Sequence, residues 1–210
     1  MLKLLHAIKH GYLRLIEPVA DWFIRLGISP NVITTTGTVC ACLAGVSFAS
    51  GQISIAGWTL GIFAFFDVVD GTVARRTGQA TDFGAFYDST LDRIADGFLF
   101  GGLAFFYASS EIHRSMTMLA IAMIGLMATF LTSYTRARAE AFSIDMKGVG
   151  MMERPERIAL LAAPQAFFGL ALDGWILRAV VTLLAVTAVL TVVQRVKHVA
   201  NVTRLRSTTT

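Results

Sequence analysis

Four aspartates with helical spacing stand in apolar stretches of the chain, and they are the residues best suited to chemistry: Asp67, Asp70, Asp88 and Asp92. Residues three or four apart share one face of a helix, so each successive pair should present its carboxylates together. A carboxylate inside a bilayer costs about 2.5–3.5 kcal/mol on insertion scales, and residues kept there are usually functional or paired. Carboxylate oxygens suit hard divalent cations such as Mg²⁺ or Mn²⁺, and the lack of His or Cys in this group argues against zinc.

The two pairs of aspartates should meet at one end of two antiparallel helices, because the connection 75–81 is short and polar. Small residues nearby, Gly71, Ala74 and Gly84, would let the helices approach closely. Converging carboxylates repel one another, and two metal ions sharing a carboxylate would neutralise them and form a clamp for phosphoryl transfer. A competing interpretation is that these helix-end carboxylates pair with three arginines: Arg75, Arg76 and Arg93.

The composition is that of a membrane protein. Of the 210 residues, 55% are hydrophobic and only 15% are charged, and the mean hydropathy is +0.63. Ordinary soluble domains are about 45–50% apolar and about 25% charged. The net charge of +4 gathers between apolar stretches, and no basic stripe with interleaved aromatics indicates nucleic-acid binding. The two cysteines, Cys40 and Cys42, are interpreted as packing residues.

Six apolar stretches approach the roughly 20 residues that a helix needs to cross a bilayer. They cover residues 31–50, 53–76, 82–109, 114–141, 155–172 and 175–198. The predicted fold is therefore all-α and integral to the membrane, with six transmembrane helices in a catalytic domain at 28–200. An amphipathic helix at 1–27 should lie in the membrane interface, and residues 201–210 are predicted to form a disordered tail. Lys and Arg concentrate on one side of this arrangement, so both termini and the aspartates should face the cytoplasm.

Taken in order, these residues resemble a known family signature. The segment runs Asp67-Val-Val-Asp70-Gly71-Thr-Val-Ala74-Arg75, then eight residues, then Gly84-Ala-Phe-Tyr-Asp88-Ser-Thr-Leu-Asp92. It matches every fixed position of D-x2-D-G-x2-A-R-x8-G-x3-D-x3-D, the signature of the CDP-alcohol phosphotransferase family. Eight fixed residues over 26 positions make a highly specific signal. The six apolar stretches and the N-terminal segment also resemble that family.

The resemblance implies a metal-dependent enzyme. Asp67, Asp70 and Asp88 would be metal ligands, and Asp92 would bind a metal and act as the catalytic general base. Two ions, Mg²⁺ or Mn²⁺, and a homodimer in the cell membrane are also implied. The acceptor alcohol would attack a CDP-linked lipid such as CDP-diacylglycerol, and CMP would leave. Six residues would contact the nucleotide or its diphosphate: Asn31, Thr34, Gly71, Ala74, Arg75 and Gly84.

For the first two of these residues, ordinary helical roles stay open as alternatives. Asn31 could be a helix N-cap, and Thr34 could be a helical threonine without a ligand.

Several arginines in three segments, 133–140, 153–157 and 194–195, are predicted to lie at one membrane depth, which indicates an anion site that a phosphate would fit. Their segments are similar to those of the prokaryotic phosphatidylinositol-phosphate synthases, a subgroup whose acceptor is inositol 1-phosphate. The resemblance implies that three of these arginines bind the acceptor phosphate: Arg136, Arg154 and Arg195. Lysine is common at the first position, where Arg136 keeps the charge but not the geometry. The positive-inside trend and pairing with nearby glutamates would also place arginines here.

Other functions are kept as alternatives. A phosphatidylglycerophosphate synthase would take glycerol 3-phosphate, and an archaeal-type relative would use an ether-linked (archaetidyl) donor. An ion transporter could use intramembrane carboxylates, but it would need them along a whole path across the bilayer, whereas these gather on one side. A non-catalytic scaffold would not need all four aspartates.

Overall fold

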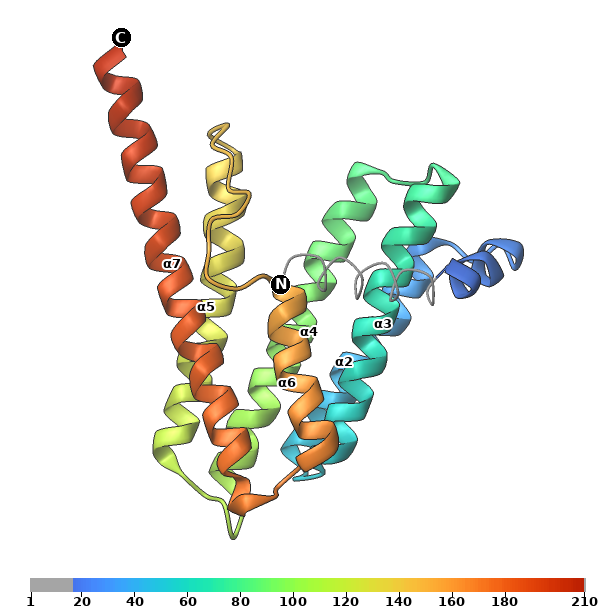
Figure 1. Ribbon diagram of the computed structural model, residues 1–210, viewed down its shortest axis with the longest axis vertical. Coiled ribbons are helices and arrows are strands. Elements are labelled where there is room, and N and C mark those ends of the chain that lie inside the picture. The colour runs from blue at the N-terminus through green and yellow to red at the C-terminus, as the bar shows by residue number, and fades with distance from the viewer. Residues whose placement is uncertain (1–16, 210) are drawn as a thin grey trace, which may run out of the picture.

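The structure is a computed structural model, and it describes residues 17–209. All regular secondary structure in this range is helical, as predicted, and residues 17–25 form the first described helical stretch. The predicted interfacial helix at 1–27 falls mostly in residues 1–16, outside the described residues. The elements that follow are α2 (Pro30–Ala49), α3 (Ile53–Thr77), α4 (Asp82–Ser109), α5 (Met116–Glu140), α6 (Arg154–Phe168), the short 3-10 helix η1 (Leu172–Gly174) and α7 (Trp175–Thr209). The long helices lie side by side and fan apart toward the end that carries the C-terminus (Figure 1).

Each of the six predicted apolar stretches corresponds to one long helix, and each helix begins within two residues of its predicted start. Within residues 17–209, four stretches are long and apolar enough to cross a membrane: α2, α3, α5 and Leu172–Arg206. Helix α4 carries several aspartates, and α6 has only 15 residues. The chain is therefore a helical membrane protein, and membrane crossing by α4 and α6 stays a prediction.

The C-terminal segment differs from the predicted disordered tail at 201–210. Helix α7 continues to Thr209 and has 35 residues, so it is roughly 50 Å long. No glycine or proline interrupts its sequence, so no helix-breaking residue ends it earlier. Arg206 ties the extension to the loop after α5, because its guanidinium donates to the carbonyl oxygens of Phe142 (3.1 Å) and Ser143 (2.9 Å).

Glycines let neighbouring helices approach closely at two places. A Cβ on Gly102 of α4 would collide with the backbone of Gly45 in α2. A Cβ on Gly57 of α3 would collide in the same way with the backbone of Ala166 in α6. Small residues favour such backbone contact between membrane helices, where van der Waals packing drives association. Each of the helices that carry the aspartates is thus fixed against a neighbour.

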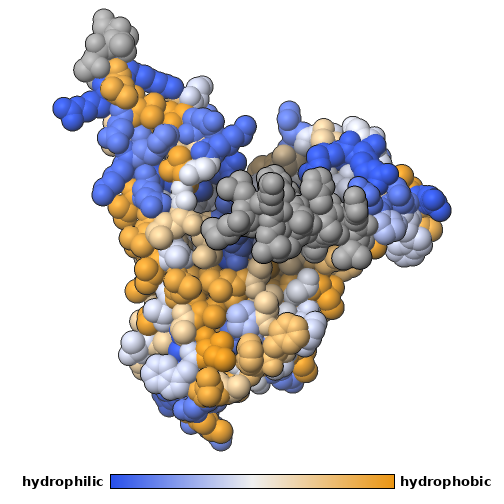
Figure 2. Space-filling model, in the orientation of Figure 1, coloured by the Kyte–Doolittle hydropathy of each residue, from blue (hydrophilic) through white to orange (hydrophobic). Residues whose placement is uncertain are grey.

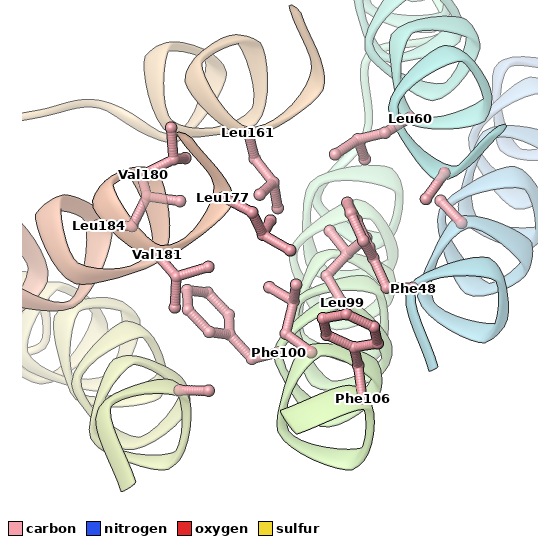
Figure 3. Packing of buried hydrophobic residues seen from close by; sticks show 14 of the residues in the cluster. Phe48, Leu60, Leu99, Phe100, Phe106, Leu161, Leu177, Val180, Val181 and Leu184 are labelled. Carbon is pink, nitrogen blue, oxygen red and sulfur yellow. The ribbon is translucent and has the colours of Figure 1, made fainter. Parts of the chain in front are cut away.

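The buried apolar core lies on one side of the aspartates. On α4 its first residue is Ala95, three residues after the last aspartate of the signature, and Leu99 and Leu103 continue it. Leu161 of α6 and Leu177 of α7 pack into the same cluster, and Figure 3 shows them converging on the side chains of α4. The four aspartates therefore lie at the edge of a packed core that holds the helices in place.

Large apolar side chains cover the outside of the helices. Val46, Trp58, Phe105, Met127 and Val186 are all exposed, although each belongs to a helix with a packed inner face. Such a surface suits lipid tails and not water. In Figure 2 apolar residues dominate the lower part of the molecule, whereas hydrophilic residues gather over the upper ends of α5 and α7 and over the α3–α4 connection. The aspartates of α3 and α4 lie toward this hydrophilic end.

Replacement of Gly102 by Val should destabilise the fold, because the new side chain has no room against α2. Overpacking of this kind costs about 1–3 kcal/mol, so the thermal midpoint in detergent should fall by several degrees. Gly101→Val is the matched control, since a Cβ on Gly101 meets no atom within 4 Å. Equal midpoints for the two variants, measured by intrinsic tryptophan fluorescence, would contradict the close contact.

Candidate active site

The carboxylates of Asp67, Asp88 and Asp92 come together between α3 and α4. One carboxylate oxygen from each of the three residues lies within 4.8 Å of one carboxylate oxygen from each of the other two. All three side chains are partly buried. The structure therefore brings together three of the four aspartates that the sequence predicted to converge.

A tight connection gives α3 and α4 this antiparallel arrangement. Helix α3 ends at Gly78, whose φ of 68° lies in the left-handed region that glycine adopts without strain. Helix α4 begins after Thr81, whose hydroxyl accepts a hydrogen bond of 3.0 Å from the N–H of Gly84 and so caps the helix. The turn fixes the two acidic helix faces opposite each other.

Asp70 adjoins the three carboxylates and is turned toward α2. Three residues advance a helix by about 300°, so the side chain of Asp70 points about 60° away from that of Asp67. The Asp70 side chain is buried, and its Oδ2 accepts a hydrogen bond of 2.6 Å from the Thr34 hydroxyl. The predicted nucleotide residue Thr34 and the predicted metal ligand Asp70 are therefore in direct contact.

Other predicted nucleotide residues lie at the starts of α2 and α4. A Cβ on Gly84 would lie 3.7 Å from the Asn31 Oδ1, so these two positions face each other. The N-cap of α2 is Ser29, and Asn31 therefore does not take the capping role that the sequence left open. The Asn31 amide is instead next to a glycine that leaves space in front of it.

Three residues predicted to contact the nucleotide or its diphosphate lie in the last two turns of α3: Gly71, Ala74 and Arg75. A Cβ on Gly71 would lie 3.2 Å from Arg75 Nη1, so the guanidinium lies over the glycine. The side chain of Arg75 is exposed, and its Nη2 donates to the Thr72 hydroxyl at 3.4 Å. Ala74 is a small, partly buried neighbour in the same turn. These residues follow Asp70 on the same helix, and their contact with a nucleotide stays a prediction.

Arg154 of α6 enters the acidic group from the other side. Its Nη1 lies 2.8 Å from Asp92 Oδ1 and 3.5 Å from Asp67 Oδ1. Its Nε lies 3.7 Å from Asp96 Oδ1. Its guanidinium carbon lies 5.3 Å from the centre of the Phe63 ring, within the range of a cation–π interaction. Arg154 thus offsets part of the negative charge, in addition to the acceptor role predicted for it.

A cavity of about 840 Å³ opens beside Asp92 and Arg154. It lies among α4, α5, α6 and α7, and the segment 146–153 forms part of its wall. Arg136 and Arg195 also line it, so the three arginines predicted to bind the acceptor phosphate share one cavity with the predicted general base. The volume lies in the range of small-molecule sites, roughly 300–1,000 Å³.

Two of these arginines are held by contacts within the chain. Arg195 donates from Nε to the carbonyl oxygen of Val149 at 3.0 Å and from Nη1 to that of Thr132, and so joins α7 to α5 and to the loop after it. Arg136 pairs with Glu140 one turn later, with 3.0 Å between Nε and Oε1. This pair is the glutamate pairing that the sequence left open for the arginines.

Three more basic residues line the cavity and were not among the predicted site residues: Arg93, Lys147 and Arg157. Arg157 donates from Nη1 to the Thr129 hydroxyl at 3.1 Å. Arg93 contacts the neighbouring Asp92, with 3.3 Å between Nη2 and Oδ2. The position of Arg157 three residues after Arg154, on the same helix face, is a signal that could have indicated it.

The three converging carboxylates fit a hard divalent cation. Their ligand atoms are all oxygens, and among the described residues no His or Cys joins the group. This donor set suits Mg²⁺ or Mn²⁺. Asp70 lies beside the group, and its Oδ2 accepts a hydrogen bond from the Thr34 hydroxyl.

Comparison with known proteins places the chain in a family. Residues 27–203 match the family model of the CDP-alcohol phosphatidyltransferases, so the chain belongs to that family and is a transferase. The phosphatidylinositol phosphate synthase of Mycobacteroides abscessus is 34% identical over 192 residues, which cover 91% of this chain and 86% of the relative. The archaetidylinositol phosphate synthase of Methanothermobacter thermautotrophicus is 36% identical over 186 residues, covering 89% of each.

Solved structures agree with this placement. The crystal structure of Mycobacterium tuberculosis phosphatidylinositol phosphate synthase with CDP-DAG bound matches with a TM-score of 0.79 and 34% identity, and the match covers 89% of this chain and 94% of that one. The same enzyme in complex with manganese and citrate matches with a TM-score of 0.78 and 34% identity, covering 88% of each chain. The predicted membrane-enzyme fold is therefore confirmed, and a metal-dependent reaction is supported.

Replacement of Asp88 by Asn should weaken Mn²⁺ binding by at least about tenfold, because one anionic ligand of the three is lost. Mn²⁺ affinity of the purified protein can be measured by electron paramagnetic resonance of the free ion. Asp82→Asn, at the exposed start of the same helix, is the matched control and should bind Mn²⁺ as the unmodified protein does. Unchanged affinity in the Asp88 variant would show that the metal binds elsewhere.

Proposed function

We propose that the protein transfers a phosphatidyl or archaetidyl group from a CDP-linked lipid to inositol 1-phosphate and releases CMP. The observation that carries this proposal is one cavity that connects the acidic group to several arginines. Asp92 lines this cavity together with Arg136, Arg154 and Arg195. A phosphorylated alcohol in this cavity would have cations for its phosphate and a carboxylate for its hydroxyl.

Asp92 acts as the general base in this proposal. Its carboxylate accepts the proton of the acceptor hydroxyl, whose oxygen then forms a bond to the lipid-side phosphorus. The bond from that phosphorus to the bridging oxygen breaks, and CMP leaves with the electron pair. Contacts to Arg154 and Arg93 on its two oxygens hold the base in a fixed orientation. Bound divalent ions supply charge that stabilises the transferring phosphoryl oxygens.

The donor is held by the acidic group and by the predicted nucleotide residues around it. Asp67, Asp70, Asp88 and Asp92 would hold two ions, Mg²⁺ or Mn²⁺. Around them Asn31, Thr34, Gly71, Ala74, Arg75 and Gly84 would contact the CDP portion. The bare backbone at Gly71 and Gly84 allows a close approach of the nucleotide, and Arg75 would pair with its diphosphate. The similar phosphatidylinositol phosphate synthase has been solved with CDP-DAG bound and in complex with manganese and citrate, which supports this assignment.

The acceptor is inositol 1-phosphate in this proposal, bound through Arg136, Arg154 and Arg195. The similar proteins named phosphatidylinositol phosphate synthase and archaetidylinositol phosphate synthase support an inositol phosphate over glycerol 3-phosphate. The family membership also favours an enzyme over an ion transporter or a scaffold. We further propose a homodimer in the cell membrane with six membrane-crossing helices and with both termini facing the cytoplasm.

Purified protein with Mg²⁺ or Mn²⁺ should release CMP from CDP-diacylglycerol when inositol 1-phosphate is added. Glycerol 3-phosphate and free inositol should give little release, and an ether-linked CDP-lipid tests the second donor. Asp92→Asn is the control for the site, because loss of the base should lower turnover by at least about a hundredfold. Preference for glycerol 3-phosphate would overturn the inositol assignment and keep the enzyme class. No CMP release with any acceptor would overturn the proposed function.

A further inference from the structure

Asp96 is a buried carboxylate that the signature does not include. It follows Asp92 by one helical turn on α4, and its side chain is only 6% exposed. It does not belong to the group of three carboxylates that could hold a metal. Burial of an unpaired charge is unfavourable, so a carboxylate in this position needs a cationic partner.

That partner is Arg154. Its Nε lies 3.7 Å from Asp96 Oδ1, whereas its Nη1 lies 2.8 Å from Asp92 Oδ1. Asp92 and Asp96, which lie one turn apart on α4, therefore attract different nitrogens of the Arg154 guanidinium. The Phe63 ring covers the guanidinium on a third side. The Arg154 side chain is 14% exposed, so its orientation is set by these neighbours and not by bulk solvent.

Arg157 lies near Asp96 and Arg154 and adds a second cation to this buried group. Asp96, Arg154 and Arg157 together line a small cavity of about 20 Å³, whose remaining walls are apolar. Four buried polar atoms of these residues have no hydrogen-bond partner in the described part of the chain: Asp96 Oδ2, Arg154 Nε, Arg154 Nη2 and Arg157 Nε. A water molecule needs roughly 10–15 Å³ and two to four polar partners. The small cavity has both the space and the polar side chains.

We propose that Asp96 is a positioning residue, which with a bridging water molecule holds Arg154 between Asp92 and the acceptor cavity. This inference rests on the proposed function, since Arg154 is given a role toward the acceptor phosphate. Without the charge of Asp96, Arg154 and Arg157 repel each other, and Asp92 is the nearest carboxylate left to Arg154. Arg154 then pairs more closely with Asp92 and is less available to the acceptor phosphate, whereas the CDP portion, bound on the other side of the acidic group, keeps its contacts.

Asp96→Asn should therefore raise the KM for the phosphorylated acceptor by about tenfold, the scale seen when the hydrogen-bonding partner of a site residue is lost. The KM for the CDP-lipid should stay within about twofold in the same variant. Asp96→Glu keeps the charge and should restore most of the acceptor affinity. The acceptor is whichever phosphorylated alcohol the unmodified enzyme uses, so failure of the inositol assignment remains separate from failure of this inference.

Leu99→Ala is the matched control for simple destabilisation. Leu99 lines the same small cavity and is fully buried, but it carries no charge. It should lower the thermal midpoint without changing the ratio of the two KM values. An Asp96→Asn variant with unchanged acceptor KM, or one that weakens both substrates equally, would overturn the inference.

A double variant keeps the test decisive if Asp96→Asn alone does not fold. Adding Arg157→Gln to Asp96→Asn removes one positive charge together with the negative charge of Asp96. The net charge of the buried group is then the same as in the unmodified protein. Its acceptor KM is compared with that of Arg157→Gln alone, and a further rise of about tenfold supports the role of Asp96. Equal KM values in these two variants would overturn it. A high-resolution structure should also show a water between Asp96 and the two arginines, and an empty cavity would remove the water from the proposal.

Discussion

The close approach of like charges is the constraint on which this structure depends. Carboxylate oxygens within 4.8 Å of one another would repel by about 3 kcal/mol per pair at an effective dielectric constant of about 20. Arg154 offsets part of this repulsion from α6, and bound cations would offset more. Because three helices supply the charges, α3, α4 and α6 must each be fixed in position before the site can exist. The glycine contacts of α4 with α2 and of α3 with α6 provide that support.

The division of the molecule into an apolar and a hydrophilic end explains how two unlike substrates could meet. The main buried core, with exposed apolar side chains such as Val46, Trp58 and Phe105 around it, occupies the part of the helices beyond the aspartates. The basic cavity lies at the hydrophilic end, where α5 and α7 diverge from the α3–α4 pair (Figure 1). In the proposed reaction a lipid donor keeps its tails in the bilayer, and a charged acceptor enters from the aqueous side. Asp92 lies where the two environments adjoin.

The sequence predicted the helices and the acidic site well, because both follow from local spacing. The start of each long helix and the pairing of Asp88 with Asp92 need only the helical period and a short turn. The orientation of Asp70 toward Thr34 could not be predicted, since it depends on how α2 packs against α3. The same holds for Arg154, whose sequence neighbours indicate an anion site but whose guanidinium lies among carboxylates. The helical extension of α7 to Thr209 could not be predicted from the terminal position of residues 201–210, and its contact through Arg206 with the loop after α5 is tertiary.

The most direct test of the central claim is a crystal structure of the protein with Mn²⁺, with the ions located by their anomalous scattering. The peaks should lie among the carboxylates of Asp67, Asp88 and Asp92, next to the Arg154 guanidinium and open to the arginine-lined cavity. Manganese bound away from these side chains, with the three carboxylates paired only to arginines, would show that the acidic group is a structural salt-bridge network and not the centre of the reaction.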